Sequence, residues 1–233
     1  YHRSYAEYRQ AKANLVRFQQ EQDFCVLNYD NIVSRSFSDL TKARVSYFSR
    51  SQKNNGAYID NKTIYYQADL IGKTDDIKLR GQHNWDNVCA AVAATRAAGV
   101  GLAAIRTAVF SFSGLEHRLE PVGTFRGVSY YNDSFSTTPE TAIAAIRSFT
   151  EPLILIAGGS DKGSDYTELG KAIAVSTVKS LILIGQMADQ IRRAVLQAGF
   201  SGRIVFQPRT MADVVRLAAT EAREGDVVLL SPA

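Results

Sequence analysis

Short apolar runs alternate with amphipathic segments along the second half of the chain. The apolar runs occupy residues 128–133, 152–159, 178–185, 203–207 and 226–233. The segments between them carry apolar residues at helical spacing, which predicts helices over 138–149, 166–176, 190–199 and 211–222. Strands that are apolar throughout and alternate with helices favour a parallel sheet covered on both faces. We therefore predict an α/β fold here, a Rossmann-like, mostly parallel, doubly wound domain.

The first half of the chain lacks this regular alternation. Its pattern predicts helices over 1–20, 36–42, 83–99 and 102–112. It also predicts strands over 23–31, 43–50 and 76–81, and a hairpin over 56–67 with its turn at Asp60–Asn61. The composition shifts near residues 112–114, so we expect two domains, 1–112 and 113–233.

The bulk composition argues against nucleic acid binding, a membrane span and a zinc site. The 233 residues are 45% hydrophobic and 21% charged, with a net charge of +4. Lys and Arg are scattered, so nothing indicates nucleic acid binding, and no apolar run is long enough to span a membrane. Cys25 and Cys89 lie in apolar surroundings without zinc-site spacing, which predicts free thiols in a reducing compartment. We expect a cytoplasmic monomer that contacts neither nucleic acid nor membrane.

The stretch YYNDSFSTTPE, residues 130–140, places many small polar side chains between a predicted strand and a predicted helix. Ser, Thr and Pro suit a helix start, and Glu140 suits the positive end of the helix dipole. One Thr and one Pro would suffice for capping, whereas Asp133 at the strand end adds a group that a ligand could use. From the residues alone, capping and ligand binding are about equally supported.

Neither of the two common phosphate-binding patterns occurs in the sequence. There is no GxGxxG after a strand and no GxxxxGK[ST] anywhere. The one Gly-rich turn after a strand, AGGSDKGSDY, carries Asp161 and Lys162 where a dinucleotide would need bare backbone. These features count against a dinucleotide-dependent oxidoreductase, and the sequence by itself shows no complete nucleotide site.

Five segments, in chain order, resemble the ATP-dependent Mur ligases of peptidoglycan synthesis: EYRQAK, GQHNWDNVCAA, FSGLEHRLE, YYNDSFSTTPE and AGGSDKGSDY. The resemblance covers essentially the whole chain and is greatest to the D-glutamate-adding members. It implies the C-terminal part of a P-loop ATPase-type central domain over 1–112. Over 113–233 it implies a Rossmann-like, amino-acid-binding domain, truncated at its end. The UDP-binding domain and the P-loop would lie upstream, so we expect the isolated chain to be inactive.

The resemblance also implies a reaction. Such an enzyme uses ATP and Mg²⁺ to join D-glutamate to UDP-N-acetylmuramoyl-L-alanine through an acyl phosphate, which is a carbon–nitrogen ligation. Two alternatives stay open. One is a ligase for another amino acid, including a folylpolyglutamate-type enzyme, and the other is a non-catalytic binding module with the same fold. An intact P-loop upstream would favour an enzyme.

In the first domain the resemblance assigns four site residues. Lys12 matches a lysine carried as a carbamate, whose oxygens help to hold Mg²⁺. Without the resemblance, Lys12 would be interpreted as an ordinary exposed helix lysine. His83, Asn84 and Asn87 match positions that contact the nucleotide, since an amide offers both a donor and an acceptor to an adenine edge. For Asn84 alone, a helix cap is the simpler interpretation.

In the second domain Arg118 matches an arginine that contacts ATP phosphate, a task for which the guanidinium fork is suited. A salt bridge near the domain boundary is the rival interpretation. Asp133 matches an acid near the ribose and phosphates of ATP. The resemblance therefore implies Lys12, Arg118 and Asp133 as the catalytic residues.

The same resemblance assigns Thr137 and Lys162 to the amino acid substrate. Lys162 matches a lysine that pairs with the side-chain carboxylate of D-glutamate. One position departs from the family pattern NDSKATN, because Phe135 stands where the lysine is expected. The charge balance at this place, and with it the assignment of D-glutamate, depends on what replaces that lysine.

Overall fold

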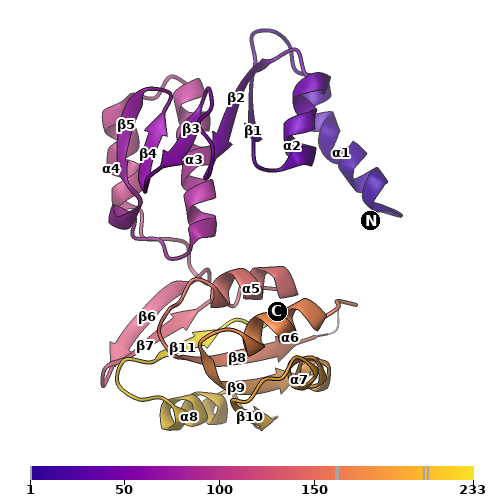
Figure 1. Ribbon diagram of the computed structural model, residues 1–233, viewed down its shortest axis with the longest axis vertical. Coiled ribbons are helices and arrows are strands. Elements are labelled where there is room, and N and C mark those ends of the chain that lie inside the picture. The colour runs from indigo at the N-terminus through magenta and orange to yellow at the C-terminus, as the bar shows by residue number, and fades with distance from the viewer. Residues whose placement is uncertain (1, 161–162, 207, 209) are drawn as a thin grey trace. The chain divides into compact units, whose positions relative to one another are not determined.

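The chain forms two compact units, Tyr1–Phe112 and Ser113–Ala233, which are described separately (Figure 1). The structure is a computed structural model, and it describes residues 2–160, 163–206, 208 and 210–233. Among the described residues, no helix combines the length and apolar character that crossing a membrane requires.

The first unit is built on one five-stranded sheet in the order β1-β2-β3-β4-β5. Its strands are β1 Phe24–Asn28, β2 Arg44–Ser49, β3 Ala57–Asp60, β4 Thr63–Tyr66 and β5 Asp69–Lys73. Its helices are α1 Tyr5–Arg17, α2 Ile32–Arg35, α3 Gln82–Ala97 and α4 Leu102–Ser111, with short 3-10 turns at Ser36–Leu40 and Thr74–Asp76. β1, β2 and β3 are parallel, and β3, β4 and β5 form an antiparallel meander.

One face of this sheet packs against α3 and α4. Cys89, Val92 and Ala93 of α3 are completely buried, and they meet Ile64 of β4 and Ile105 of α4 in a single apolar cluster. Val16 of α1 packs with Cys25 and Leu27 of β1 in a second cluster. The helices are therefore held by their apolar stripes, as the sequence period predicts.

Two details of the first unit differ from the sequence prediction. The strand predicted over 76–81 is wrong: those residues follow a 3-10 turn and pair with no strand, although Ile77 is buried. The actual strand is β5, which the pattern missed because its sequence DLIGK buries only Ile71. The hairpin turn also lies one residue later than predicted, at Asn61 and Lys62, whose φ angles of 45° and 59° suit a type I′ turn.

The second unit is built on a six-stranded sheet in the order β10-β9-β8-β11-β7-β6. Its strands are β6 Glu120–Phe125, β7 Val128–Asn132, β8 Leu153–Gly159, β9 Val178–Gly185, β10 Arg203–Phe206 and β11 Val227–Leu230. Its helices are α5 Pro139–Ile146, α6 Thr167–Ala174, α7 Ala188–Gln197 and α8 Met211–Glu221. All strand pairs are parallel except β6 with β7, so the predicted fold class is confirmed.

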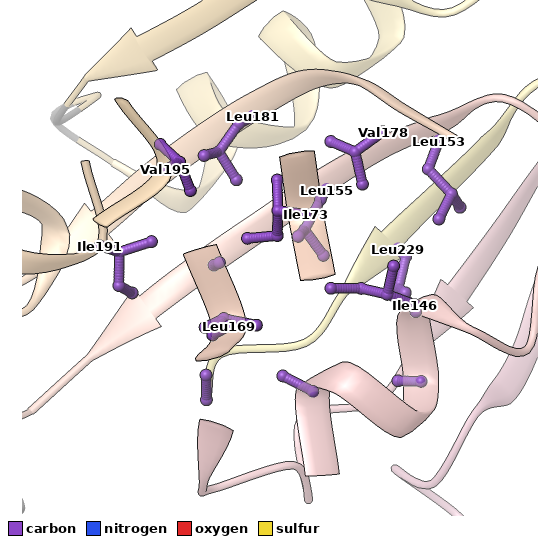
Figure 2. Close-up of a cluster of buried hydrophobic side chains, with 14 of the residues drawn as sticks. Ile146, Leu153, Leu155, Leu169, Ile173, Val178, Leu181, Ile191, Val195 and Leu229 are labelled. Carbon is purple, nitrogen blue, oxygen red and sulfur yellow. The ribbon is translucent and has the colours of Figure 1, made fainter. Parts of the chain in front are cut away.

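Helices cover both faces of this sheet, with α5 and α6 on the side opposite to α8 (Figure 1). The larger core joins α5, α6 and α7 to β8, β9 and β11, and Figure 2 shows its side chains converging from these elements. Leu155, Leu169, Leu181 and Leu229 are completely buried there. On the other face Val214 and Ala218 of α8 pack on the alternate residues of the same strands. Burial on both faces explains why these strands are apolar throughout.

The pattern missed β6, the edge strand of this sheet. Its sequence EPVGTF contains Pro121 and Gly123, and its pairing with β7 shifts register between these two residues. Proline and glycine are tolerated at edges and bulges but remove the alternation that marks a strand. Residues 120–123 therefore look like a linker in sequence although they extend the sheet.

Candidate functional site

Asp133 is a buried carboxylate at the end of β7, with 4% of its surface exposed. Its Oδ1 accepts a hydrogen bond from the Leu119 backbone N–H at 3.0 Å, and its Oδ2 accepts one from the Ser231 hydroxyl at 2.9 Å. Its own backbone N–H donates to the Leu230 carbonyl at 2.7 Å, which continues the pairing of β7 with β11. A buried carboxylate needs such partners. Asp133 therefore ties the segment around Leu119 to the end of β11.

Arg118 lies in the turn that Asp133 holds. The Arg118 side chain is exposed, while the neighbouring His117 and Leu119 adopt left-handed φ angles of 64° and 44°. The His117 backbone N–H donates to Glu120 Oε2 at 2.8 Å. His117 Nδ1 also lies 2.9 Å from the Asn132 side-chain amide. The structure thus brings together the segments that contain Arg118 and Asp133, which belong to the motifs FSGLEHRLE and YYNDSFSTTPE.

The start of α5 separates capping residues from the rest of the polar stretch. Thr138 is the N-cap, Pro139 is the first helical residue, and the Thr138 N–H donates to the Thr141 hydroxyl at 3.2 Å. Ser136 instead joins the loop, since its carbonyl accepts from the Ala233 N–H at 3.1 Å. Thr137 is exposed between these two groups. Capping therefore accounts for part of the polar surplus and leaves Thr137 accessible.

The parallel strands place these groups at one edge of the sheet. Leu230 of β11 is in register with Asn132 of β7 and with Ile156 of β8, so β7 and β11 end at the same level and β8 continues to Gly159. This edge is where ligands bind in open α/β sheets. The predicted substrate residue Lys162 follows β8 and lies outside the described residues.

Gly158, near the end of β8, has a packing requirement of its own. Its φ is +132°, and a Cβ atom there would lie 1.8 Å from the Ile184 carbonyl oxygen of β9. Its N–H donates to the Pro232 carbonyl at 2.7 Å. Close backbone approach therefore explains this glycine.

In the first unit Lys12 lies on the exposed side of α1. Its Nζ lies 5.5 Å from the centre of the Tyr8 ring, beside a groove formed with β1. Its amine is accessible, so a carbamate could form there without displacing a neighbour. Among the described residues, no group of three or more His, Cys, Asp or Glu side chains gathers to hold a metal. The fit of Mg²⁺ to the described part of this unit therefore rests on Lys12.

The first turns of α3 bring the predicted nucleotide residues together. Asn84 is buried, its Nδ2 donates to the Arg80 carbonyl at 2.6 Å, and its Oδ1 accepts from Asn87 Nδ2 at 3.1 Å. Asn87 itself is exposed and His83 is half-buried. Asn84 therefore orients the exposed side chain of Asn87 through this hydrogen bond.

A charged cluster beside α3 was not among the predicted site residues. Asp30, just after β1, accepts hydrogen bonds from the hydroxyls of Ser49 and Ser51, each at 2.8 Å. Burial raises the pKa of the Asp30 carboxyl. The hydrogen bonds from these two hydroxyls and from the Arg50 backbone N–H, together with the charge of Arg50, lower that pKa by more, so the net pKa lies below its ordinary value. Arg50 Nε lies 3.7 Å from Asp86 of α3. Asp30 at a strand end was the available sequence signal.

Asp86 shows the opposite balance. Its burial raises the pKa of the carboxyl, the nearby Arg50 lowers it, Asp30 raises it again and His83 lowers it, with a net increase. The cluster fixes the first turns of α3 to the loop after β2.

Ser231, the partner of Asp133, was also missed by the sequence analysis, because 98 residues separate the two in sequence.

Family comparisons agree with the two units. The family model described as "Mur ligase middle domain" matches residues 1–95, and the one described as "Mur ligase, glutamate ligase domain" matches residues 117–233. The UDP-N-acetylmuramoylalanine–D-glutamate ligase of Clostridioides difficile is 40% identical over 237 aligned residues, with all of this chain and 52% of that protein covered. The enzyme of the same name from Symbiobacterium thermophilum is 41% identical, again with all of this chain and 52% of that protein covered.

Solved structures show the same fold at low identity. The UDP-N-acetylmuramoylalanyl-D-glutamyl-2,6-diaminopimelate–D-alanyl-D-alanyl ligase of Acinetobacter baumannii matches with a TM-score of 0.75 at 15% identity, over 98% of this chain and 52% of that one. The MurF ligase of Thermotoga maritima matches with a TM-score of 0.73 at 15% identity, over 99% of this chain and 54% of that one. The chain spans about half the length of the curated relatives it matches. With one family model matching half of its residues and a second matching most of the rest, the chain belongs to the Mur ligase family.

Proposed function

We propose that the protein acts as an ATP-dependent ligase that joins D-glutamate to UDP-N-acetylmuramoyl-L-alanine in peptidoglycan precursor synthesis. Curated relatives at 38–41% identity carry the name of that enzyme, which supports D-glutamate over another amino acid. The fold alone would suit several ligases, since the solved structures that it matches include enzymes with other names. The proposal includes a monomer working in the cytoplasm.

Arg118 and Asp133 are the residues of the second unit that we propose for ATP. The Arg118 guanidinium is exposed and permanently charged, so it can donate two parallel hydrogen bonds to phosphate oxygens. Asp133 holds the Arg118 turn through Leu119, and we place the Asp133 carboxylate near the ribose and phosphates. In the first unit we propose Asn87, oriented by Asn84, and His83 for the adenine.

For the amino acid we propose Thr137, which is exposed at the start of α5, and Lys162. For Mg²⁺ we propose Lys12 as an indirect ligand after carbamylation, in which its neutral amine adds to carbon dioxide and releases a proton. When bound, ATP would supply the phosphoryl group that activates a carboxylate for attack by an amine. The chain's own residues would bind and orient the reactants for that transfer.

One observation carries the proposal: Arg118 stands exposed in a turn whose backbone is fixed to a buried carboxylate at the ligand-binding edge of a parallel sheet. The test is Arg118→Ala in the full-length enzyme. Loss of a charge-assisted contact costs about 1.5–3 kcal/mol, so kcat/KM for ATP should fall by about 10- to 150-fold. Steady-state kinetics at varied ATP measures this change.

Arg192→Ala is the matched control for this experiment. Arg192 lies on α7 of the same unit, is exposed, and packs on an aromatic ring as Arg118 does. We expect wild-type constants for ATP from this control. Wild-type constants from Arg118→Ala as well would refute the role of Arg118. Ligation of another amino acid in preference to D-glutamate would correct the substrate.

A further inference from the structure

The backbone around Arg118 is unusually constrained. His117 and Leu119 both lie in the left-handed region, at φ 64° and 44°, which L-residues occupy at a cost of about 1–3 kcal/mol each. Besides the hydrogen bond from the His117 N–H to Glu120, three contacts hold them there. Leu119 donates to Asp133, His117 pairs with Asn132, and the His117 carbonyl accepts from the Phe135 N–H at 2.9 Å. The fold thus stabilises a strained turn whose central side chain is Arg118.

The Arg118 side chain is oriented by different means. Its Cζ lies 5.5 Å from the centre of the Phe135 ring, within the range of a cation–π interaction. Within the described part of this unit, the structure gives the Arg118 guanidinium no hydrogen bond or ion pair. The Phe135 ring is therefore the one contact there that fixes the direction of the guanidinium.

Phe135 does not belong to the core. It lies in the turn between β7 and α5, and 64% of its surface is exposed. An exposed phenylalanine contributes little burial energy, so core packing does not account for this side chain. The same residue fixes the turn twice, through its N–H to His117 and through its ring to Arg118.

An aromatic face positions a guanidinium without consuming its donors. The five N–H groups of arginine lie in the guanidinium plane, and a ring that contacts the flat face leaves all five available. A carboxylate partner would instead use two of them and neutralise the charge. We propose that Phe135 is a positioning residue that holds Arg118 ready to bind an anionic oxygen group of the ligand. The inference rests on the proposed role of Arg118.

A double-mutant cycle in the full-length enzyme tests this inference. A cation–π contact at an exposed site should change kcat/KM for ATP by about two- to fivefold, so Phe135→Leu should lower it by that factor. The loss should appear in KM for ATP, with KM for the amino acid unchanged. Phe135→Tyr, which keeps a ring face, should restore the wild-type value. In an Arg118→Ala background, Phe135→Leu should have no further effect.

The control is Phe206→Leu, which removes the equivalent contact of Phe206 with Arg192 at 5.4 Å and should leave ATP kinetics unchanged. A readout without nucleotide comes from NMR of the free protein. The Arg118 side-chain protons should be shifted by the ring current in the wild type and in Phe135→Tyr, and not in Phe135→Leu.

Each outcome separates the two ideas. An unshifted Arg118 signal in the wild type, or an equal loss from Phe135→Leu in both backgrounds, overturns the positioning role of Phe135 whatever Arg118 does. A ring-current shift together with an Arg118→Ala enzyme that uses ATP normally would keep the contact and refute the proposed role of Arg118 in binding ATP. Thermal unfolding of Phe135→Leu checks its folding, and Phe135→Met provides a second ring-free variant.

Discussion

At the scale of single residues, the least exposed titratable groups are the two thiols. Burial raises the pKa of Cys89 to about 12, helped by the charges of Asp86 and Asp30, and burial also raises the pKa of Cys25. The thiolate is the reactive form, so both cysteines should be inert in the folded protein. The sequence predicted free thiols, and both are free and buried in the structure.

We predict that thiol reagents at pH 8 leave Cys25 and Cys89 unmodified in the native protein and modify both in denaturant. Peptide mass spectrometry after labelling measures each position. Because the folded pKa of Cys89 exceeds the ordinary value, its contribution to stability is present below pH 9 and is lost as the pH rises from 9 towards 12. Rapid labelling of Cys89 at pH 8 in folded protein would contradict the burial of α3.

At the scale of elements, the turn of the β6–β7 hairpin has a residue at its first position that does not favour the backbone conformation found there. Its two-residue loop, Arg126 and Gly127, has φ angles of 51° and 75°, which define a type I′ turn. Glycine suits the second position, whereas arginine at the first adopts a left-handed conformation that asparagine tolerates better. The hairpin forms because β6 and β7 pair along their length.

Arg126→Asn should therefore stabilise the second unit, by up to about 1 kcal/mol in the free energy of unfolding. Arg126→Val, with a branched side chain that resists positive φ, should destabilise it. Denaturant unfolding followed by circular dichroism measures both variants. If asparagine and valine had the same effect, the conformation assigned to this turn would be wrong.

At the scale of the whole molecule, the second unit contains its own core on both faces of its sheet. A unit with a closed core of this kind can fold alone. Among the described residues, the twelve largest completely buried side chains include eleven from this unit, one of which is Leu155 of the central strand β8. The stability of residues 113–233 should therefore depend on that core.

We predict that residues 113–233, expressed alone, unfold in one cooperative thermal transition. Leu155→Ala should cost about 2–5 kcal/mol, because Leu155 is completely buried between helices and strands. Val175→Ala is the matched control, since Val175 is 87% exposed and its truncation should change the midpoint little. A broad, non-cooperative transition would show that the unit depends on the rest of the chain.

Elements with a local signal could be predicted from the sequence alone. The strands β8, β9 and β11 and the helices between them were predicted because two-sided burial requires continuous apolar runs and helical burial requires a 3.6-residue period. The alternation of these elements was enough to predict a doubly wound sheet. The polar motifs were enough to place Asp133 at the end of a strand and to identify the family. Their roles, like those of Lys12, Asn87 and Thr137, stay predictions.

Features that depend on partners distant in the chain could be recognised only once the fold was known. The strand β6 has too little alternation to be recognised, and pairing with β7 makes it a strand. Ser231 became part of the Asp133 site because β11 inserts between β8 and β7, which no local pattern specifies. Phe135, which stands where the family pattern has a lysine, could be interpreted only in the structure, because its ring lies beside the Arg118 guanidinium. Local periodicity reports which face of an element is buried, whereas long-range packing decides which elements and side chains meet there.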